Sequence, residues 1–352
     1  MNGVVRLLGV TAAFLLLSFW STQARADYER RFDVTLRPGV GATLRVTVRE
    51  NARYGGACVG PTLAFVHGFA HSGATWNPLV DEIFGAGRRG LACKALLLDL
   101  PGHGQSSLPR GALFGELLID DYVMAVIGAL AELRRGGLQP TALIGHSMGG
   151  LIVEGVQARL LAEGSSLSRR FGIHFAALMS PSAAIEHPWV FAESGAAAAI
   201  VGSLFTLDAA KGPVLRVDSA TWRPLFFTAL GDALAPSAPS AAQIDALGYD
   251  FDEAAFAGSQ LVGAAPFSRI SVGARPFDPR NGTLLAFVSP SQDKFSLREE
   301  AQVAYVQLTG DTRRLGFFRV DDAFAVHDMH VSEPRRYLSL ALYGWLSGLS
   351  LR

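Results

Sequence analysis

A serine between two glycines is the first group in this 352-residue sequence that could do chemistry. Residues 145–149 read Gly-His-Ser-Met-Gly, follow a short apolar run and open a helix-like stretch. A serine held on a sharp turn between a strand and a helix is exposed for attack, and flanking glycines let the strand and the helix pass closely. The placement predicts that Ser147 attacks an acyl carbon, whereas the five-residue pattern alone is a weak signal.

The elements that must position this serine are short, nearly continuous apolar runs, which are typical of parallel strands covered by helices on both faces. Helix-like stretches at 120–133 and 151–161 alternate with the runs, and this alternation predicts a mostly parallel sheet. Two earlier segments, 31–37 and 44–49, alternate apolar with polar residues and predict an antiparallel pair. The expected parallel strands are 62–66, 95–98, 141–144, 175–179, 284–288 and 315–320.

One long interval, residues 183–279, interrupts this alternation. It shows no clear strand and contains Ala-rich, Phe-rich and Trp-rich segments punctuated by prolines. Loops of that length are rarely structureless in a compact domain, so the interval is predicted to be a mainly helical cap. The expected organisation is therefore a leader at 1–26, a core in two parts at 27–182 and 280–352, and the cap between those parts.

Three segments, in this order along the chain, resemble motifs of the α/β-hydrolase family. Residues 65–70 (Phe-Val-His-Gly-Phe-Ala) are similar to its oxyanion loop, 99–107 (Asp-Leu-Pro-Gly-His-Gly-Gln-Ser-Ser) to the turn after its next strand, and 145–149 to its nucleophile elbow. The resemblance covers nearly all of the chain apart from the leader and the cap. It implies an α/β fold with helices flanking a mostly parallel sheet and a catalytic order of serine, acid, histidine.

The acid of such a triad should follow a late strand. Asp293 lies in the loop after the run at 284–288 and is the preferred candidate. Asp278 and Asp311 are weaker candidates because neither directly follows a clear strand, and Glu186, after the run at 175–179, is a further alternative.

The base should lie between the last strand and the last helix, because a serine hydroxyl needs a base to remove its proton. His327 and His330 both lie there. The family pattern places the histidine several residues before an acidic residue and a proline, here Glu333 and Pro334, and therefore favours His327. The alternative role for His330 is packing or a supporting hydrogen bond.

The resemblance also implies an oxyanion hole made by two backbone N–H groups. Phe69, after His67 and Gly68, and Met148, next to the serine, are the expected donors. The remaining polar side chains of these motifs are expected to shape turns and packing, namely those of His67, Asp99, His103 and His146.

Charge and the N-terminal segment limit where the protein acts. Basic and acidic residues are equal in number, 31 each, without long runs of either, so the sequence has no electrostatic footprint for nucleic acid. Residues 1–26 combine Arg6, an apolar stretch at 7–20 and Ala24-Arg25-Ala26, the pattern of a cleaved export signal. The alternative is a retained anchor, but the stretch is shorter than the roughly 20 residues that span a membrane.

The two cysteines, Cys58 and Cys93, each precede a run predicted to be one of two neighbouring strands. They would pair in an oxidising compartment, and otherwise they are two small core residues. Neither has metal-ligand spacing with a histidine, so no metal is expected, and the triad chemistry needs no cofactor.

Together these patterns predict an exported, periplasmic or secreted serine hydrolase that acts on a small-molecule or lipid ester, with peripheral lipid contact as a further expectation. An acyltransferase, a carbon–carbon bond hydrolase and a non-catalytic binding protein on the same scaffold are the alternatives. Aromatic residues could line an acyl pocket beneath the cap, although aromatic residues in helices are more often simply core. They are Trp76, Trp189, Phe191, Trp222, Phe226 and Phe227.

Overall fold

The computed structural model describes the chain from residue 27 to residue 350, with internal gaps. The described residues are 27–52, 58, 60–85, 91–180, 205–209, 212–215, 219–229, 234–247, 249, 254–255, 275–293, 298–338 and 342–350. The export signal expected at 1–26, with Glu186, Trp189 and Phe191, lies outside them.

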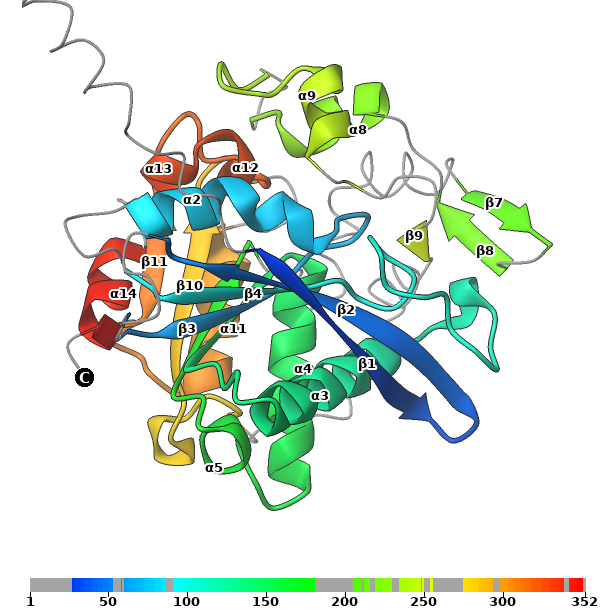
Figure 1. Cartoon of the computed structure of the whole chain (residues 1–352). Coiled ribbons are helices and arrows are strands. Elements are labelled where there is room, and N and C mark those ends of the chain that lie inside the picture. The colour runs from blue at the N-terminus through cyan, green and yellow to red at the C-terminus, as the bar shows by residue number, and fades with distance from the viewer. Residues whose placement is uncertain are drawn as a thin grey trace, which may run out of the picture.

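An eight-stranded sheet forms the centre of the fold (Figure 1). Its strand order is β1-β2-β4-β3-β5-β6-β10-β11, and all neighbours from β4 to β11 are parallel, while β1–β2 and β2–β4 are antiparallel. The strands are β1 (Tyr28–Arg37), β2 (Val40–Glu50), β3 (Thr62–Val66), β4 (Lys94–Leu98), β5 (Ala142–His146), β6 (Phe175–Met179), β10 (Leu284–Pro290) and β11 (Phe317–Val320). The predicted fold class, a mostly parallel α/β sheet flanked by helices, is confirmed.

Helices cover both faces of this sheet, which explains why its central strands consist of apolar residues without alternation. One hydrophobic cluster packs α3 (Ile119–Arg135), α4 (Met148–Ala162), α5 (Leu167–Phe171) and α11 (Arg298–Thr309) against one face. A second cluster packs α2 (Asn77–Gly85), α12 (Met329–Ser332), α13 (Pro334–Tyr337) and α14 (Tyr343–Ser350) against the other. β5 is buried along its whole length because helices cover both of its faces.

The expected cap interval is less helical than predicted in the part that the structure describes. It contains α8 (Ser219–Phe226) and α9 (Ala241–Ala246), but also a small antiparallel sheet of β7 (Phe205–Asp208), β8 (Gly212–Leu215) and β9 (Ala254–Ala255). The expectation of no strand there was wrong, because these strands have only two to four residues, too few to show an alternating pattern. Gly212, with φ of +78°, adopts the left-handed backbone next to the turn between β7 and β8.

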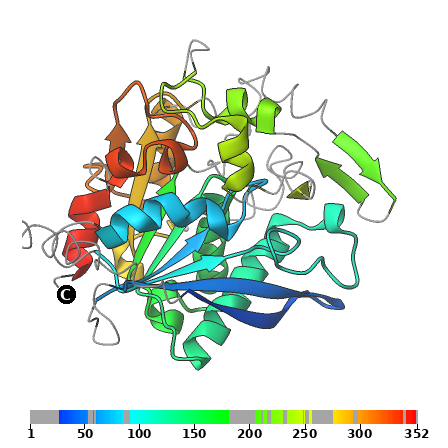
Figure 2. The ribbon, with the colours of Figure 1, turned by 45° about the horizontal axis from the view of Figure 1, so that its top comes forward.

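The two helices of this interval pack onto the core at the end of the sheet where the parallel strands finish. Trp222, Phe226 and Phe227 share a buried cluster with Val326 and Val331, which flank the candidate base. Figures 1 and 2 show α8, α9 and α12 at the same end of the molecule. α8 and α9 therefore lie over the edge of the sheet that carries Ser147.

Cys58 and Cys93 form a disulfide with their Cα atoms 5.7 Å apart. They precede β3 and β4, which are neighbouring parallel strands, so both lie at the same end of the sheet. Of the two predictions for these cysteines, the disulfide is the one that the structure contains. Among the described helices, none has both the length and the apolar character required to cross a bilayer.

Glu154 is an ionisable residue in the middle of α4, and its side chain is only 1% exposed. Its Oε1 has no hydrogen-bond partner among the described residues. Burial disfavours the charged carboxylate and raises the pKa of Glu154 to about 8. In the unfolded chain the same group would ionise near its ordinary value of 4.5.

We predict that Glu154→Gln stabilises the protein, and more so at pH 8 than at pH 5. Between these values the carboxyl is already largely ionised in the unfolded chain, whereas the folded chain keeps most of its proton until the pH approaches 8. The wild type therefore loses stability as pH rises, by at most roughly 1.4 kcal/mol per pH unit. Chemical denaturation of both proteins at each pH measures the difference. The half-exposed Glu82 of α2 supplies the control Glu82→Gln, and an equal gain for Glu154→Gln at both pH values would contradict the prediction.

Candidate active site

Ser147 lies on the turn that joins β5 to α4, in a backbone conformation that L residues rarely adopt. Its φ is +52° and its ψ is −121°, and its N–H donates to the carbonyl of Met179 on β6 at 3.0 Å. The residue is 8% exposed. Such strain persists only where the surrounding structure imposes it, and it is concentrated at functional sites.

The two flanking glycines are required by close backbone contacts. A Cβ atom at Gly145 would lie 2.3 Å from the carbonyl oxygen of Gly149, and one at Gly149 would lie 2.2 Å from that of Val66 on β3. No side chain fits at either position unless the backbone moves. The turn between β5 and α4 can therefore form only with glycine two residues before and two residues after Ser147.

Asp293 and His327 contact each other although they are far apart in the sequence. His327 Nδ1 lies 2.9 Å from Oδ1 and 3.0 Å from Oδ2 of Asp293, and both side chains are almost fully buried. Burial alone would lower the pKa of His327, but the charge and hydrogen bond of Asp293 outweigh it and raise that pKa. Because a carboxylate only accepts hydrogen bonds, Nδ1 carries a proton, and in the neutral ring Nε2 is the basic nitrogen.

The loop of His327 lies against residues that flank Ser147. His146, the last residue of β5, has Nε2 at 3.1 Å from the carbonyl oxygen of His327, and Ser180 Oγ donates to the same oxygen at 3.2 Å. The rings of His146 and His327 have centroids 4.9 Å apart. The structure thus brings the turn at Ser147 and the pair of His327 and Asp293 to one edge of the sheet, where β5, β6 and β10 end.

The predicted oxyanion loop also lies against Ser147. A Cβ atom on Gly68 would be 3.1 Å from Cβ of Ser147, so the loop backbone touches the serine. Met148 is the first residue of α4, where backbone N–H groups have no partner inside the helix and the helix dipole favours negative charge. Phe69 and Met148 are therefore both placed beside Ser147.

His67, Asp99 and His103 hold turns together. Leu100 N–H donates to His67 Nε2 at 3.0 Å, so the proton of the neutral ring is on Nδ1, which lies 2.8 Å from the carbonyl of Gly68. Burial lowers the pKa of His67 well below its ordinary value. Asp99 accepts from the backbone of Gly73 at 2.7 Å, and His103 Nδ1 lies 3.1 Å from the carbonyl of Pro101.

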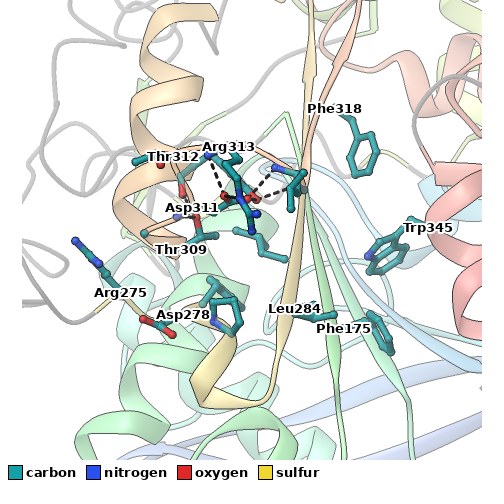
Figure 3. A pocket seen from close by; sticks show the side chains of 17 residues that line it. Phe175, Arg275, Asp278, Leu284, Thr309, Asp311, Thr312, Arg313, Phe318 and Trp345 are labelled. Atoms are coloured by element: carbon teal, nitrogen blue, oxygen red, sulfur yellow. Dashed lines mark hydrogen bonds and ion pairs between the residues drawn. The ribbon is translucent and has the colours of Figure 1, made fainter.

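The alternative acids lie at the opposite end of the sheet from Ser147. Asp278 precedes β10 and binds Arg280, and Asp311 precedes β11 and accepts from Tyr305 and from the backbone of Leu315. Both line a pocket of about 610 Å³ whose wall includes residues at the starts of β6 and β10 (Figure 3). Because parallel strands end at the other edge, this pocket is separate from the serine.

The alternative base, His330, is buried among rings. Its ring centroid lies 4.1 Å from that of His146 and 4.9 Å from that of Trp76, and neither ring nitrogen has a hydrogen-bond partner among the described residues. Burial lowers the pKa of His330 to about 3, so this imidazole stays neutral near pH 7. Its surroundings give it a packing role.

A buried polar cluster beside the serine was not anticipated from the sequence. Asp328 is fully buried, accepts from the hydroxyl of Tyr249 at 2.7 Å, and has Oδ2 at 3.3 Å from His71 Nε2. Burial would raise the pKa of Asp328, but the charges of His71 and neighbouring histidines lower it far below its ordinary value. The position of Asp328 directly after His327 is the only sequence signal for this cluster.

Two sets of side chains in this region are close enough to suggest metal ligands. Donor atoms of His71, His146 and His330 lie within 4.8 Å of one another, as do those of His146, His327 and Asp328. In the first set, however, His71 Nδ1 contacts a carbonyl and Nε2 faces Asp328; in the second, His327 Nδ1 is bound to Asp293. In the first set both ring nitrogens of His71 therefore already face oxygen atoms, whereas in the second set Asp293 engages only the Nδ1 of His327 and not its Nε2.

The chain is similar in sequence to parts of several curated hydrolases. It is 32% identical over 117 residues to (E)-2-((N-methylformamido)methylene)succinate hydrolase from Acinetobacter baylyi, a match covering 33% of this chain and 40% of that protein. It is 35% identical over 95 residues to protein phosphatase methylesterase 1 from Mus musculus, a match covering 26% of this chain and 22% of that protein. The matches thus span two fifths or less of these relatives.

Solved structures share the fold over nearly the whole chain. A peroxisomal α/β-hydrolase from Saccharomyces cerevisiae has a TM-score of 0.60 at 13% identity and covers 93% of this chain and 90% of its own. A thermophilic esterase from Thermogutta terrifontis has a TM-score of 0.54 at 16% identity, and the match covers 91% of this chain and 99% of the esterase. The family model described as "Alpha/beta hydrolase family" matches residues 63–340, so this chain belongs to the alpha/beta hydrolase family.

Proposed function

We propose that this protein is an exported serine hydrolase that cleaves carboxylic esters of hydrophobic substrates, with Ser147, His327 and Asp293 as its catalytic triad. The observation that carries the proposal is the buried pair of His327 and Asp293, held against the residues that flank a strained serine. Ser147 combines a positive φ with flanking glycines at which a Cβ atom would clash with the backbone, and such strain is concentrated at functional sites.

In the proposed reaction, Nε2 of His327 removes the proton of the Ser147 hydroxyl as the oxygen attacks the ester carbonyl. Asp293 holds the ring through Nδ1 and stabilises the imidazolium that forms. The N–H groups of Phe69 and Met148 bind the developing oxyanion, and His327 then protonates the leaving alcohol. Water, deprotonated by the same nitrogen, releases the acid from the acyl-enzyme.

The preference for a hydrophobic substrate rests on the aromatic side chains above the base. Trp222 and Phe226 stack with ring centroids 3.8 Å apart, and the ring of Phe226 lies 5.2 Å from that of His327. Both come from α8 of the interval over the sheet edge. An ester of small molecules or lipids with an apolar acyl or alcohol part would fit such surroundings, and peripheral contact with a lipid surface belongs to the same proposal.

Export is proposed from the pattern of residues 1–26 and is supported by the disulfide between Cys58 and Cys93, since disulfides persist mainly in oxidising compartments. The esterase and methylesterase names among the similar proteins agree with ester hydrolysis, although those relatives are matched only in part or share only the fold.

A fluorophosphonate probe should label the protein that begins at Asp27, and Ser147→Ala should abolish the labelling. The probe forms its bond with a serine oxygen that a neighbouring base has activated, and alanine has no such oxygen. Gel fluorescence and mass spectrometry of the labelled peptide report the outcome, with Ser165→Ala, in the loop between α4 and α5, as the control serine. Labelling that persists in Ser147→Ala would assign the nucleophile elsewhere.

For the base and the acid, we expect His327→Gln and Asp293→Asn each to lower kcat on p-nitrophenyl butyrate by roughly ten-thousandfold, because each breaks the unit that activates the serine. His330→Gln is the matched histidine control and should lose less than tenfold. Circular dichroism checks that each variant folds. If His330→Gln were the more damaging change, the two histidines would exchange roles.

For export, the prediction is that expression of the full chain in a Gram-negative host yields a periplasmic or secreted protein whose N-terminus is Asp27. The apolar stretch would engage the export machinery, and cleavage would follow Ala26. Cell fractionation and N-terminal mass spectrometry make the measurement. Deletion of residues 2–20 is the control and should leave the protein in the cytoplasm; a full-length chain in the membrane fraction would instead indicate an anchor.

A further inference from the structure

The peptide units before and after Phe69 are both held by contacts to their carbonyl oxygens. The carbonyl of Gly68 belongs to the same peptide unit as the Phe69 N–H, and it lies 2.8 Å from His67 Nδ1 and 3.3 Å from the backbone N of His71. Because a trans peptide is planar and its C=O and N–H point in opposite directions, fixing the oxygen also fixes the direction of the N–H. The next carbonyl, that of Phe69, lies 2.6 Å from His71 Nδ1.

This loop needs outside support because Ala70 has a left-handed backbone. Its φ is +54°, a conformation unfavourable for a residue with a Cβ atom, and its side chain is fully buried. Ala70 packs in the same cluster as Trp222 and Phe227 of the cap interval. The support therefore comes from two sources, the ring of His71 and the packing of the cap.

Both ring nitrogens of His71 face oxygen atoms. Nδ1 lies 2.6 Å from a carbonyl oxygen and Nε2 lies 3.3 Å from Oδ2 of Asp328, so each ring nitrogen faces an acceptor. A neutral imidazole has a proton on only one nitrogen and would turn a lone pair toward one of these oxygens. In the imidazolium form both nitrogens carry protons, which satisfies both contacts and pairs a buried positive charge with the buried carboxylate.

The cap interval completes this pair. Tyr249 donates its hydroxyl to Oδ2 of Asp328 at 2.7 Å, and its ring lies 4.6 Å from the ring of His71. The backbone N–H of Asp328 donates to the carbonyl of Phe226 at 3.3 Å. The other titratable groups around the pair include His146, with Nε2 at 3.5 Å from Oδ1 of Asp328, and His330, whose ring centroid is 6.1 Å from that of His71. His327, next to Asp328 in the sequence, also acts electrostatically on its carboxylate.

We infer that His71 and Asp328 form a buried imidazolium–carboxylate pair that positions the oxyanion loop, and that Tyr249 of the cap interval holds this pair in place. The three are positioning residues, because they act on the reacting atoms through Phe69 and the loop of His327. The inference rests on the proposed function of Ser147. It adds that the cap sets the catalytic geometry in addition to lining the substrate site.

The main test compares Tyr249→Phe and His71→Gln with the wild type on an oxygen ester and on the matching thionoester. We expect kcat on the oxygen ester to fall roughly tenfold to hundredfold with KM changed less than threefold, because a misplaced N–H donor weakens the transition state and not substrate binding. The loss should be much smaller on the thionoester, since its larger sulfur gains little from the oxyanion hole. The double variant should lose no more than His71→Gln alone.

Tyr122→Phe is the matched control, because Tyr122 of α3 is also fully buried and its hydroxyl has no hydrogen-bond partner among the described residues. It should leave kcat and the oxygen-to-sulfur rate ratio unchanged. The inference would be overturned if kcat fell equally on both esters, or if the loss of kcat in the double variant were the product of the two single losses. Either result would count even if Tyr249→Phe is less thermostable than the wild type.

A second measurement does not depend on activity. Nitrogen-15 NMR of the imidazole side chains, assigned with His71→Gln, should show protons on both ring nitrogens of His71 at pH 7. A single protonated nitrogen would reject the ion pair. If the wild type failed to react with the fluorophosphonate probe while NMR showed the doubly protonated ring, the proposed function would fail and the buried pair would stand.

Discussion

The close crossing of β5, β3 and α4 at Ser147 is the constraint on which the rest of the site depends. A Cβ atom at Gly149 would clash with the carbonyl of Val66 and one at Gly145 with the carbonyl of Gly149, so the turn requires glycine at both positions. The strain is offset by a core that packs helices on both faces of the sheet. A rigid scaffold thereby holds the serine at the edge where the parallel strands end.

Parallel strands give the molecule two chemically different ends. At the carboxyl ends of β5, β10 and β11, the loops bring together Ser147, Asp293 and His327 from three distant parts of the sequence. At the opposite end, Asp278 and Asp311 make local ion pairs and turn contacts around a separate pocket. The same residue type thus has a structural role at one end and is proposed to have a catalytic role at the other.

A cluster of buried polar side chains lies at the edge that is proposed to be catalytic. Burying Asp328 costs free energy unless its charge is paired and hydrogen-bonded, and the partners come from three elements: His71 after β3, His146 on β5 and Tyr249 in the cap interval. These contacts join the loop after β3, the end of β5 next to Ser147 and the loop of His327. Tyr249 thereby contacts the loop that follows His327 through its hydrogen bond to Asp328.

The sequence by itself determined the sheet, because apolar runs without alternation can be satisfied only between two helical layers, and it determined the turn at Ser147, because its two glycines are a local requirement. The sequence did not predict β7 and β8, because strands of four residues each are too short to show an alternating pattern. Only the tertiary structure decided that Asp293 contacts His327 and that Asp328 contacts His71 and Tyr249. The two residues of these pairs are separated by 34, 257 and 79 positions, respectively. Such contacts depend on where loops fold back in space, which no local sequence pattern records.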